Sequence, residues 1–415
     1  MSSATRAPET WIGPRLSAMM FLEFLVWGGW YVTVGNYMGA HGMTDAIPWA
    51  YSLCPIAAII SPFFLGMVAD RFFATERVLS LMHLLGGVCL LAAPRFSGTA
   101  FILVLLLHTL FFMPTLGLTN TLAFHHLTNR EKQFPLIRVF GTIGWIAAGI
   151  LISAVLHGDT TAVQFYVAGG GALLLGFYSL TLPHTPPPAA GQKATFRDIL
   201  GMDSLALLKQ PAFAIFMVCS FLICIPLAFY YSYAPVFVKA IGFKDPAFNM
   251  SFGQMSEFFF MLVMPFFFAR LGVKWMLGVG MLAWVARYGF FAAAAAANPH
   301  ILWLVIAGIV LHGICYDFFF VTGQIYVDRV ASVRIRGQAQ GFLVLVTQGV
   351  GMLIGAQVAG LLVKANTVGA GTPAETVAWS SVWLIPCIAA GVILLIFLAT
   401  FRESRRAPEG ARAAA

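Results

Sequence analysis

Five ionisable side chains lie inside otherwise apolar stretches of the chain: Glu23, Arg138, Glu257, Arg287 and Asp317. A charged side chain inside a membrane costs roughly 2.5–3.5 kcal/mol on insertion scales, so such residues usually face a partner or a water-filled path. Carboxyl groups in this position can bind and release protons, and guanidinium groups can hold a carboxylate or a polar solute. The pattern favours a transporter.

The fifth predicted span carries a charge, a hydroxyl and an aromatic ring on one helical face. Its sequence R-V-F-G-T-I-G-W places Arg138, Thr142 and Trp145 at positions i, i+4 and i+7. Gly141 and Gly144 lie between them and permit a second helix to approach closely. This face can bind a polar solute that contains a ring. Alternatively, Arg138 extends its guanidinium to the headgroups at the end of the span.

The eighth predicted span places Gln254 and Glu257 one turn apart in the sequence Q-M-S-E. A carboxyl group near the middle of a span has no apolar packing role. Burial disfavours its ionised form and a nearby guanidinium favours it, which suits a group that gains and loses a proton. We expect Glu257 to gain and lose a proton, and a purely structural role is the alternative.

The tenth predicted span holds the densest polar and aromatic cluster of the second half, in the sequence H-G-I-C-Y-D-F-F. His312 and Tyr316 are four residues apart and could contact a polar substrate. Asp317, on an adjoining face, is a candidate for a second proton site or a conformational lock. His83 and His108 are isolated histidines on apolar helices, and we expect them to form hydrogen bonds inside their own bundle.

The composition explains why these residues must be positioned by membrane helices. The chain has 60% hydrophobic and only 10% charged residues, with a mean hydropathy of +0.86, whereas an ordinary soluble domain has about 25% charged residues. The first apolar run is too long for a signal-peptide h-region, so we expect it to remain as a helix. Hydropathy predicts twelve spans, at 16–39, 48–69, 78–94, 99–124, 136–156, 162–182, 211–238, 249–269, 274–297, 300–326, 337–364 and 377–401.

The distribution of lysine and arginine predicts the orientation. Most of the 24 Lys and Arg residues fall in loops on the side of the N-terminus, and only Arg95, Lys239, Lys244 and Lys364 fall on the other side. By the positive-inside rule, both termini are expected in the cytoplasm. The net charge of +8 then reflects contact with anionic lipid headgroups rather than nucleic acid.

The six cysteines lie in apolar stretches without metal-ligand spacing, so packing roles and no metal site are expected.

A long polar interruption from Pro183 to Gln210 divides the spans into six plus six. We therefore expect an N-terminal six-helix bundle over residues 1–182 and a cytoplasmic central loop over 183–210. A C-terminal six-helix bundle with a short cytoplasmic tail is expected over 211–415. Two such bundles can rock against each other.

The loop after the second span has the sequence G-M-V-A-D-R-F-F-A-T-E-R, which contains Asp70, Arg71 and Arg77. It resembles the loop signature of the major facilitator superfamily, in which an Asp and basic residues latch helix ends in one conformation. A shorter version, R-L-G-V-K with Arg270 and Lys274, occupies the matching place in the second half. An ordinary positively charged turn is the alternative for the second loop.

The whole chain, from the first predicted span to the twelfth, resembles the nucleoside:proton symporters of the major facilitator superfamily. The polar motifs above carry part of the likeness. Further stretches are F-L-V-W-G-G-W from Phe24 to Trp30, M-P-T-L-G-L-T-N-T from Met113 to Thr121, A-W-V-A-R from Ala283 to Arg287, and G-Q-A-Q-G from Gly337 to Gly341.

The resemblance implies roles for the polar residues. Arg138, Thr142, Gln254 and Glu257 would bound a substrate cavity between the two halves. Trp145 would pack on the base or sugar of the substrate, and Asp317 would take part in coupling to the proton. The chemistry adds a second expectation, that Glu257 pairs with Arg138 across the interface between the bundles. Protonation of Glu257 would weaken this pair and change which conformation is favoured, so both residues are expected to take part in proton coupling.

Several positions depart from the family pattern. The seventh span has Ala228 and Tyr231 where the best-known members carry amide side chains. His312 replaces a tyrosine, Tyr316 replaces a phenylalanine, and Glu23 stands where glutamine is common. The substrate could therefore be a different nucleoside or another hydroxylated solute.

These observations predict an all-α major facilitator fold in a bacterial inner membrane, working as a monomer without a cofactor. The expected function is import of nucleosides or nucleoside-like solutes with protons by alternating access. A sugar or polyol symporter on the same fold is an alternative, for which hexoses would compete and nucleosides would not. A solute sensor that transports nothing is less favoured because no signalling domain is evident, and no enzyme active site can be assembled from these motifs.

Overall fold

Apolar helices make up almost all of the computed structural model, which describes residues 11–64, 72–187, 202–332, 335–369 and 376–402. Strand pairing in these ranges is limited to a short antiparallel hairpin of β1 (Thr367–Val368) and β2 (Thr376–Val377). The fold is the predicted arrangement of twelve membrane helices in two six-helix bundles.

The first half begins with α1 and α2, which together form one span. Its helices are α1 (Ile12–Tyr31), α2 (Val34–Ala40), η2 (Thr44–Ala46), α3 (Ile47–Phe64), α5 (Thr75–Ala92), η4 (Ala93–Arg95), α6 (Gly98–His126), α7 (Arg130–Gly149), η5 (Ile150–Val155) and α8 (Val163–Ser179).

The second half begins after a short 3-10 helix, η6 (Met202–Lys209), at the end of the predicted central loop. Its helices are α10 (Pro211–Ala240), α11 (Pro246–Ala296), α12 (Leu302–Val310), α13 (His312–Tyr316), η7 (Asp317–Val321), α14 (Thr322–Val330), α15 (Arg336–Val344), η8 (Leu345–Gly351), α16 (Met352–Ala365) and α17 (Trp379–Thr400).

The predicted eighth and ninth spans form the two arms of α11. Gly272, between the arms, has φ 65° and ψ −178°, a conformation that glycine adopts without a steric penalty. Beyond this turn, Lys274 Nζ donates a hydrogen bond of 2.8 Å to the carbonyl oxygen of Leu398 near the end of α17. The R-L-G-V-K sequence is therefore a sharp turn that is fastened to the last helix.

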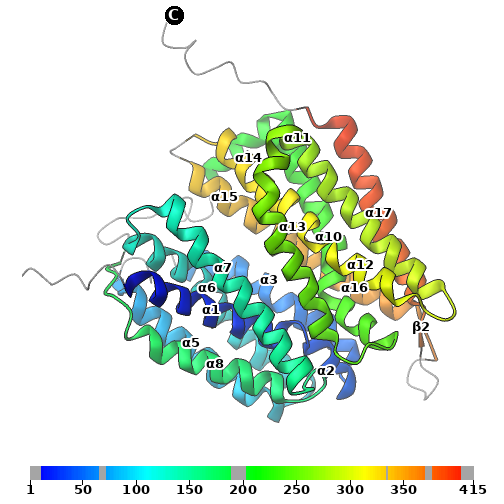
Figure 1. Ribbon diagram of the computed structural model, residues 1–415, viewed down its shortest axis with the longest axis horizontal. Helices are drawn as coiled ribbons and strands as arrows, with labels where there is room; N and C mark the ends of the chain where they lie inside the picture. The colour runs from blue at the N-terminus through cyan, green and yellow to red at the C-terminus, as the bar shows by residue number, and fades with distance from the viewer. Residues whose placement is uncertain (1–10, 65–71, 188–201, 333–334, 370–375, 403–415) are drawn as a thin grey trace, which may run out of the picture.

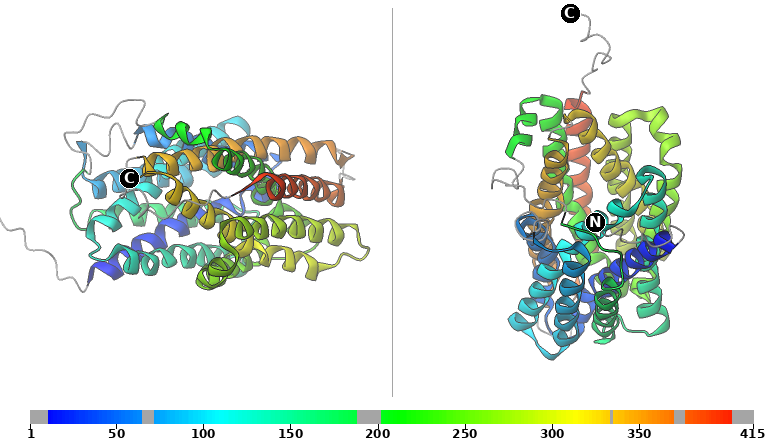
Figure 2. Two further views of the ribbon diagram at one scale, coloured as in Figure 1. Left: turned by 90° about the horizontal axis from the view of Figure 1, so that it is seen from above. Right: turned by 90° about the vertical axis from the view of Figure 1, so that its left-hand side faces the viewer.

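The two halves are separate groups of helices that lie side by side (Figures 1 and 2). In the first half α1 packs on α7 and α8, and in the second half α11 packs on α17, α12 and α13. Between the halves, α2 contacts α10, α3 contacts α16, and α7 contacts the first arm of α11. The two groups converge towards the end of the molecule where α2 is labelled in Figure 1. We call it the Asp45 end, because Asp45 lies in η2, directly after α2.

Polar contacts between the described residues of the two halves are concentrated at the Asp45 end. Asn36 donates to the Pro235 carbonyl over 3.3 Å, and Gln357 donates to Ser52 Oγ over 2.8 Å. Further contacts there are the hydrogen bond from Ala247 N to Asp159 Oδ1 (3.0 Å) and the ion pairs Lys364 with Asp45 (3.1 Å) and His157 with Asp245 (3.3 Å). The Asp45 end is thus closed by contacts between the halves.

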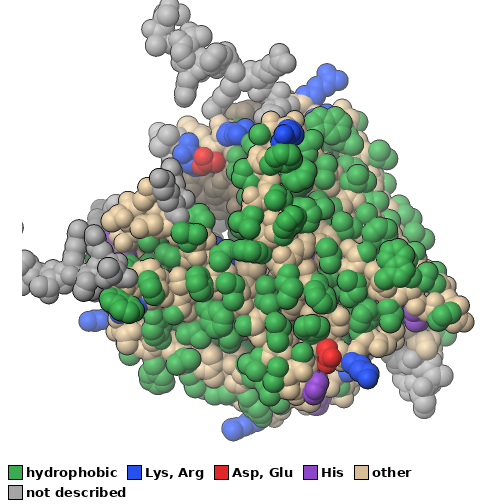
Figure 3. Space-filling view, in the orientation of Figure 1, with side chains coloured by type: hydrophobic (Ala, Val, Ile, Leu, Met, Phe, Trp, Pro, Cys, Tyr) green, Lys and Arg blue, Asp and Glu red, His purple; other side chains and the backbone are tan. Residues whose placement is uncertain are grey.

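The outer surface is apolar, as a bilayer requires. Side chains such as Trp303, Leu361 and Leu395 are 68% exposed. Figure 3 shows hydrophobic side chains over the middle of this face and charged side chains near its upper and lower edges. Nine helices in the described ranges are long and apolar enough to cross a membrane. Of the other predicted spans, α8 is a shorter helix, α3 is described as far as Phe64, and the two arms of α11 are counted as one.

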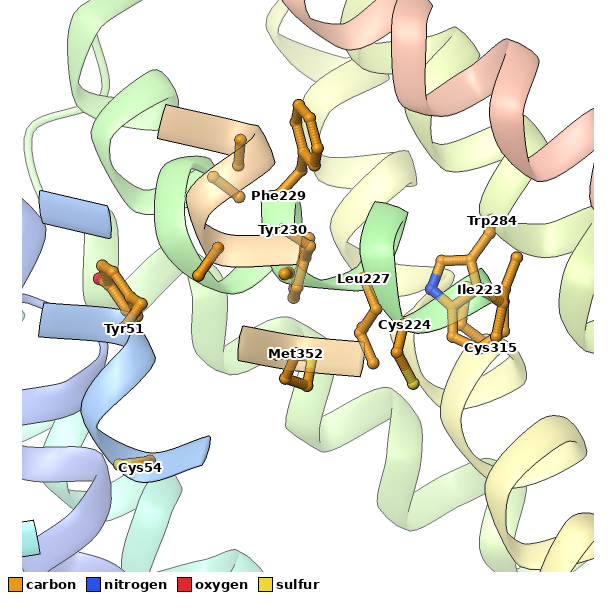
Figure 4. Packing of buried hydrophobic residues seen from close by; sticks show 14 of the residues in the cluster. Tyr51, Cys54, Ile223, Cys224, Leu227, Phe229, Tyr230, Trp284, Cys315 and Met352 are labelled. Atoms are coloured by element: carbon orange, nitrogen blue, oxygen red, sulfur yellow. The ribbon is translucent and has the colours of Figure 1, made fainter. Parts of the chain in front are cut away.

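The apolar core runs through both halves and holds several of the cysteines. In Figure 4, Cys224 and Leu227 of α10 lie near Met352 of α16, with Trp284 and Cys315 on the other side. All six cysteines are free, and four of them are buried. This agrees with the predicted packing role.

Candidate functional site

A small pocket lies between the two halves. The first half contributes Tyr31, Val32 and Trp145 to its wall. The second half contributes the remaining lining residues, which are Tyr230, Tyr231, Pro235, Met250 and Gln254. A solute in this pocket would contact both bundles at once.

Aromatic side chains make up half of the residues that line the pocket. The ring centroids of Tyr31 and Tyr231 are 6.0 Å apart, and those of Tyr31 and Trp145 are 6.4 Å apart. Trp27 supports Trp145 in an edge-to-face contact with a centroid distance of 5.5 Å. Aromatic faces held in this way can stack on a flat ring of a ligand.

Charged residues continue the site beyond Gln254. Glu257 lies one turn further along α11, and its Oε2 is 3.8 Å from Nε2 of His312. The guanidinium of Arg138, on α7, lies 4.0 Å from the ring centroid of Phe24. Arg138 and Glu257 interact electrostatically, but they do not form an ion pair in this structure. Glu257 therefore has a closer ionisable neighbour, His312, than the arginine suggested by the sequence.

Glu257 and His312 are brought together where the tenth span crosses the eighth. A Cβ atom on Gly313 would fall 2.5 Å from the carbonyl oxygen of Ser256 and 2.7 Å from the backbone nitrogen of Glu257. Only glycine permits this approach. Ser256 Oγ also donates a hydrogen bond to the Val310 carbonyl, which ties the two helices at the crossing.

Asp317 is a buried carboxyl group without a hydrogen-bond partner among the described residues. It begins the π-helical segment η7, and such segments are frequent at functional sites. Asp317 interacts electrostatically with Glu257 and with Tyr316. An unpaired ionised carboxylate inside a membrane is costly, so Asp317 is a place where a proton can be bound.

Glu23 lies apart from the pocket lining, inside the first half. Its Oε2 is 2.8 Å from Nε2 of His83, and its Oε1 accepts a hydrogen bond of 2.6 Å from Thr115. Nδ1 of His108 is 3.0 Å from the Gly86 carbonyl. Both histidines thus bond within their own bundle, as predicted, and Glu23 has a partner rather than a water-filled path.

Three of the predicted substrate residues, Trp145, Tyr231 and Gln254, line the pocket directly. His312 extends the site, because its ring contacts both Tyr231 and Tyr316. Thr142 is half-buried on the same helix as Trp145.

The predicted latch is only partly described. Asp70 and Arg71 lie outside the described residues, and Arg77 is exposed at the start of α5. Its neighbour Glu76 accepts a hydrogen bond of 2.9 Å from the backbone of Thr185 and lies 2.8 Å from His184. This end of α5 therefore holds the beginning of the central loop.

Sequence reasoning missed the aromatic residues Trp27, Tyr31 and Tyr230. The i, i+4 spacing of Trp27 and Tyr31 places both rings on one face of the first span, and Tyr230 is adjacent to Tyr231. These were the available signals. In the described part of the chain, no three His, Cys, Asp or Glu side chains are grouped as metal ligands would be.

The chain is similar to known nucleoside transporters over nearly its full length. The family described as Nucleoside H+ symporter matches residues 11–406. YegT of Escherichia coli (strain K12), a protein named as a nucleoside transporter, is 38% identical to this chain over 399 residues. The matched region covers 94% of each chain. The xanthosine permease of the same organism is 33% identical over 408 residues, covering 94% of this chain and 96% of the permease.

The fold is similar to that of a solved nucleoside transporter. A crystal structure of a single-residue variant of NupG superposes with a TM-score of 0.87 and 30% identity, covering 94% of this chain and all of NupG. This likeness confirms the major facilitator fold and a transport rather than an enzymatic function. The chain belongs to the nucleoside H+ symporter family.

Proposed function

We propose that this protein is a proton-coupled symporter that imports nucleosides or nucleoside-like solutes across a bacterial inner membrane by alternating access. The observation that carries the proposal is the aromatic pocket between the halves, which continues through Gln254 towards Glu257 and His312. A nucleoside combines a flat base with ribose hydroxyls, and this pocket combines aromatic faces with hydrogen-bonding groups. The names of the relatives support the same substrate class.

The base would stack between Trp145 and Tyr231, whose rings lie on opposite halves of the pocket wall. The ribose hydroxyls would reach Gln254 and Glu257, because an amide both donates and accepts hydrogen bonds and a carboxylate accepts them. Arg138, Thr142, His312 and Tyr316 would complete the polar side of the site.

Protons would act at Glu257 and Asp317. Both carboxyl groups are carried by membrane-spanning helices, Glu257 by α11 and Asp317 by η7. Asp317 lacks a hydrogen-bond partner in the described part of the chain. The Glu257 carboxylate interacts electrostatically with Arg138 on the opposite half. Protonation of Glu257 removes this attraction between the bundles and so changes which conformation is favoured.

The present conformation would be the one closed towards the outside. The contacts that join the halves lie at the Asp45 end, which is the outer side if both termini are cytoplasmic. Opening of this end would break those contacts. A latch that includes Asp70, Arg71 and Arg77 would form on the inner side. The boundaries at residues 182 and 211 would then separate two rocking bundles of a monomer.

Uptake into proteoliposomes tests this function. Labelled uridine and adenosine are supplied with an imposed inward proton gradient, and the assay is repeated after an ionophore has collapsed the gradient. We expect accumulation only with the gradient and no competition from hexoses. Gradient-dependent uptake of a labelled hexose, without uptake of either nucleoside, would instead identify a sugar symporter.

A further inference from the structure

Arg287 is fully buried in the second half, yet no carboxylate pairs with it in the described part of the chain. Its Nε donates a hydrogen bond of 3.1 Å to the Gly308 carbonyl, and its guanidinium lies 4.0 Å from the ring centroid of Tyr230. Its Nη2 lies 3.2 Å from Nδ1 of His312. A buried arginine bound in this way fixes its neighbours because it is charged and has only donors.

The contact with Arg287 determines which nitrogen of His312 carries the proton. Since Nη2 of Arg287 can only donate, Nδ1 of His312 must accept, and the imidazole proton therefore lies on Nε2. A doubly protonated imidazole would leave the Arg287 N–H group without its acceptor. His312 is also held in place by stacking on Tyr230, with a centroid distance of 5.2 Å.

The Nε2–H group of His312 faces Glu257. The distance of 3.8 Å between Nε2 and Oε2 is about 1 Å longer than a normal hydrogen bond. A small movement of α11 against α13 would bring the two atoms within hydrogen-bond distance. The other titratable or charged groups that interact with Glu257 come from α7, α10, α13 and η7. They are Arg138, Tyr230, Tyr231, Tyr316 and Asp317.

We infer that Arg287 is a positioning residue that keeps His312 neutral, with its Nε2–H directed at Glu257, so that His312 senses the protonation of that carboxyl group. When Glu257 is ionised, His312 donates to it and the eighth and tenth spans are drawn together. When Glu257 takes up a proton, the attraction is lost and the spans separate. This inference rests on the proposed role of Glu257 in proton coupling.

The test is the pH dependence of labelled uridine exchange in proteoliposomes with equal pH on both sides. His312→Phe keeps a ring but removes the donor, so the ionised form of Glu257 loses a charge-assisted hydrogen bond. We expect the midpoint of the pH profile to rise by about one pH unit. His312→Gln restores an N–H donor and should keep the wild-type midpoint. His108→Phe, a change at a buried histidine of the other half, is the matched control.

Arg287→Met should shift the midpoint in the opposite direction. Without the arginine donor, Nδ1 of His312 is free to take a second proton, and the resulting cation favours ionised Glu257. If this variant does not fold, the midpoints measured for the two His312 variants test the inference. A wild-type midpoint in His312→Phe, with only the rate reduced, would overturn the inference. A wild-type protein without any pH dependence would overturn the proposed function as well.

Discussion

Tyr31 of the first half and Tyr231 of the second half lie with their ring centroids 6.0 Å apart and their planes inclined by 56°. This contact crosses the interface between the two bundles, in the wall of the pocket. A substrate that stacks beside these rings contacts both halves, so its binding energy can favour one relative position of the bundles over another.

Trp145→Ala is predicted to weaken nucleoside binding. Stacking of a base on an aromatic ring contributes about 1–3 kcal/mol, which corresponds to a roughly 5- to 150-fold rise in Kd. Trp145→Phe should retain most of the affinity. Trp275→Ala, at a tryptophan that is 56% exposed on the outer surface, should leave Kd unchanged. Equilibrium binding of labelled uridine to the purified variants measures the three Kd values. Equal Kd values for Trp145→Ala and the wild type would show that Trp145 does not bind the substrate.

Glu257→Gln is predicted to uncouple transport from the proton gradient. The amide has a similar shape but cannot bind and release a proton. We expect exchange of nucleoside across the membrane to continue, and accumulation driven by the gradient to disappear. Parallel exchange and accumulation assays separate these effects, and full accumulation by Glu257→Gln would exclude this carboxyl group from coupling.

Asp317→Asn is predicted to make transport less sensitive to pH and to raise the melting temperature in detergent. The buried carboxyl group has no hydrogen-bond partner in the described ranges. Its ionised form is therefore costly, and an asparagine, which cannot ionise, avoids that cost. Asp328→Asn is the control, because Asp328 is about half-exposed and pairs with Arg336 over 3.0 Å. Exposed pairs contribute about 0–1 kcal/mol. A lower melting temperature in Asp317→Asn would contradict the prediction.

Asp159 is predicted to make the closed Asp45 end more stable at low pH. Burial raises the pKa of this carboxyl group above its ordinary value, although hydrogen bonds from Ser153 and Ala247 oppose the effect. A raised pKa means that the folded protein binds the proton more tightly than the unfolded chain. The stabilisation is therefore complete below the unfolded pKa and is lost as the pH rises through the folded pKa.

The measurement is the melting temperature as a function of pH for the wild type and Asp159→Asn. The asparagine cannot ionise, so the melting temperature of the wild type should fall progressively below that of the variant as the pH rises. Asp45→Asn, at an exposed carboxylate, should follow the wild type. A wild type that gains stability relative to Asp159→Asn with rising pH would reverse the assigned sign.

Much of the helix pattern follows from the sequence. The run of apolar residues predicts each span, and the predicted boundary between 269 and 274 contains the turn at Gly272. Helix ends were less accurate. For example, α7 begins at Arg130 rather than at 136, because the polar residues before the span continue the helix beyond the apolar stretch.

The partners of the buried charges could not be predicted. The sequence suggested Arg138 for Glu257 because opposite charges attract, whereas the closer ionisable group is His312. That proximity depends on the crossing at Gly313, a contact between different helices. Glu23 likewise pairs with His83 and Thr115 from two other helices, which no local spacing reveals.

Gly313→Ala tests whether this crossing matters. The added Cβ would collide with the backbone of Ser256 and Glu257, and overpacking of this kind costs about 1–3 kcal/mol. We expect a lower melting temperature and slower transport. Gly170→Ala, where a Cβ meets no other atom within 4 Å, should leave both unchanged. Similar behaviour of the two variants would show that α11 and α13 tolerate a wider separation.

Proton movement caused by nucleoside tests the central claim most directly. Proteoliposomes that contain a pH-sensitive dye are mixed with uridine in the absence of any imposed gradient. The account predicts acidification of the interior on addition of uridine and none on addition of a hexose. It also predicts none with Glu257→Gln. Entry of uridine without acidification, or equal acidification in Glu257→Gln, would contradict it.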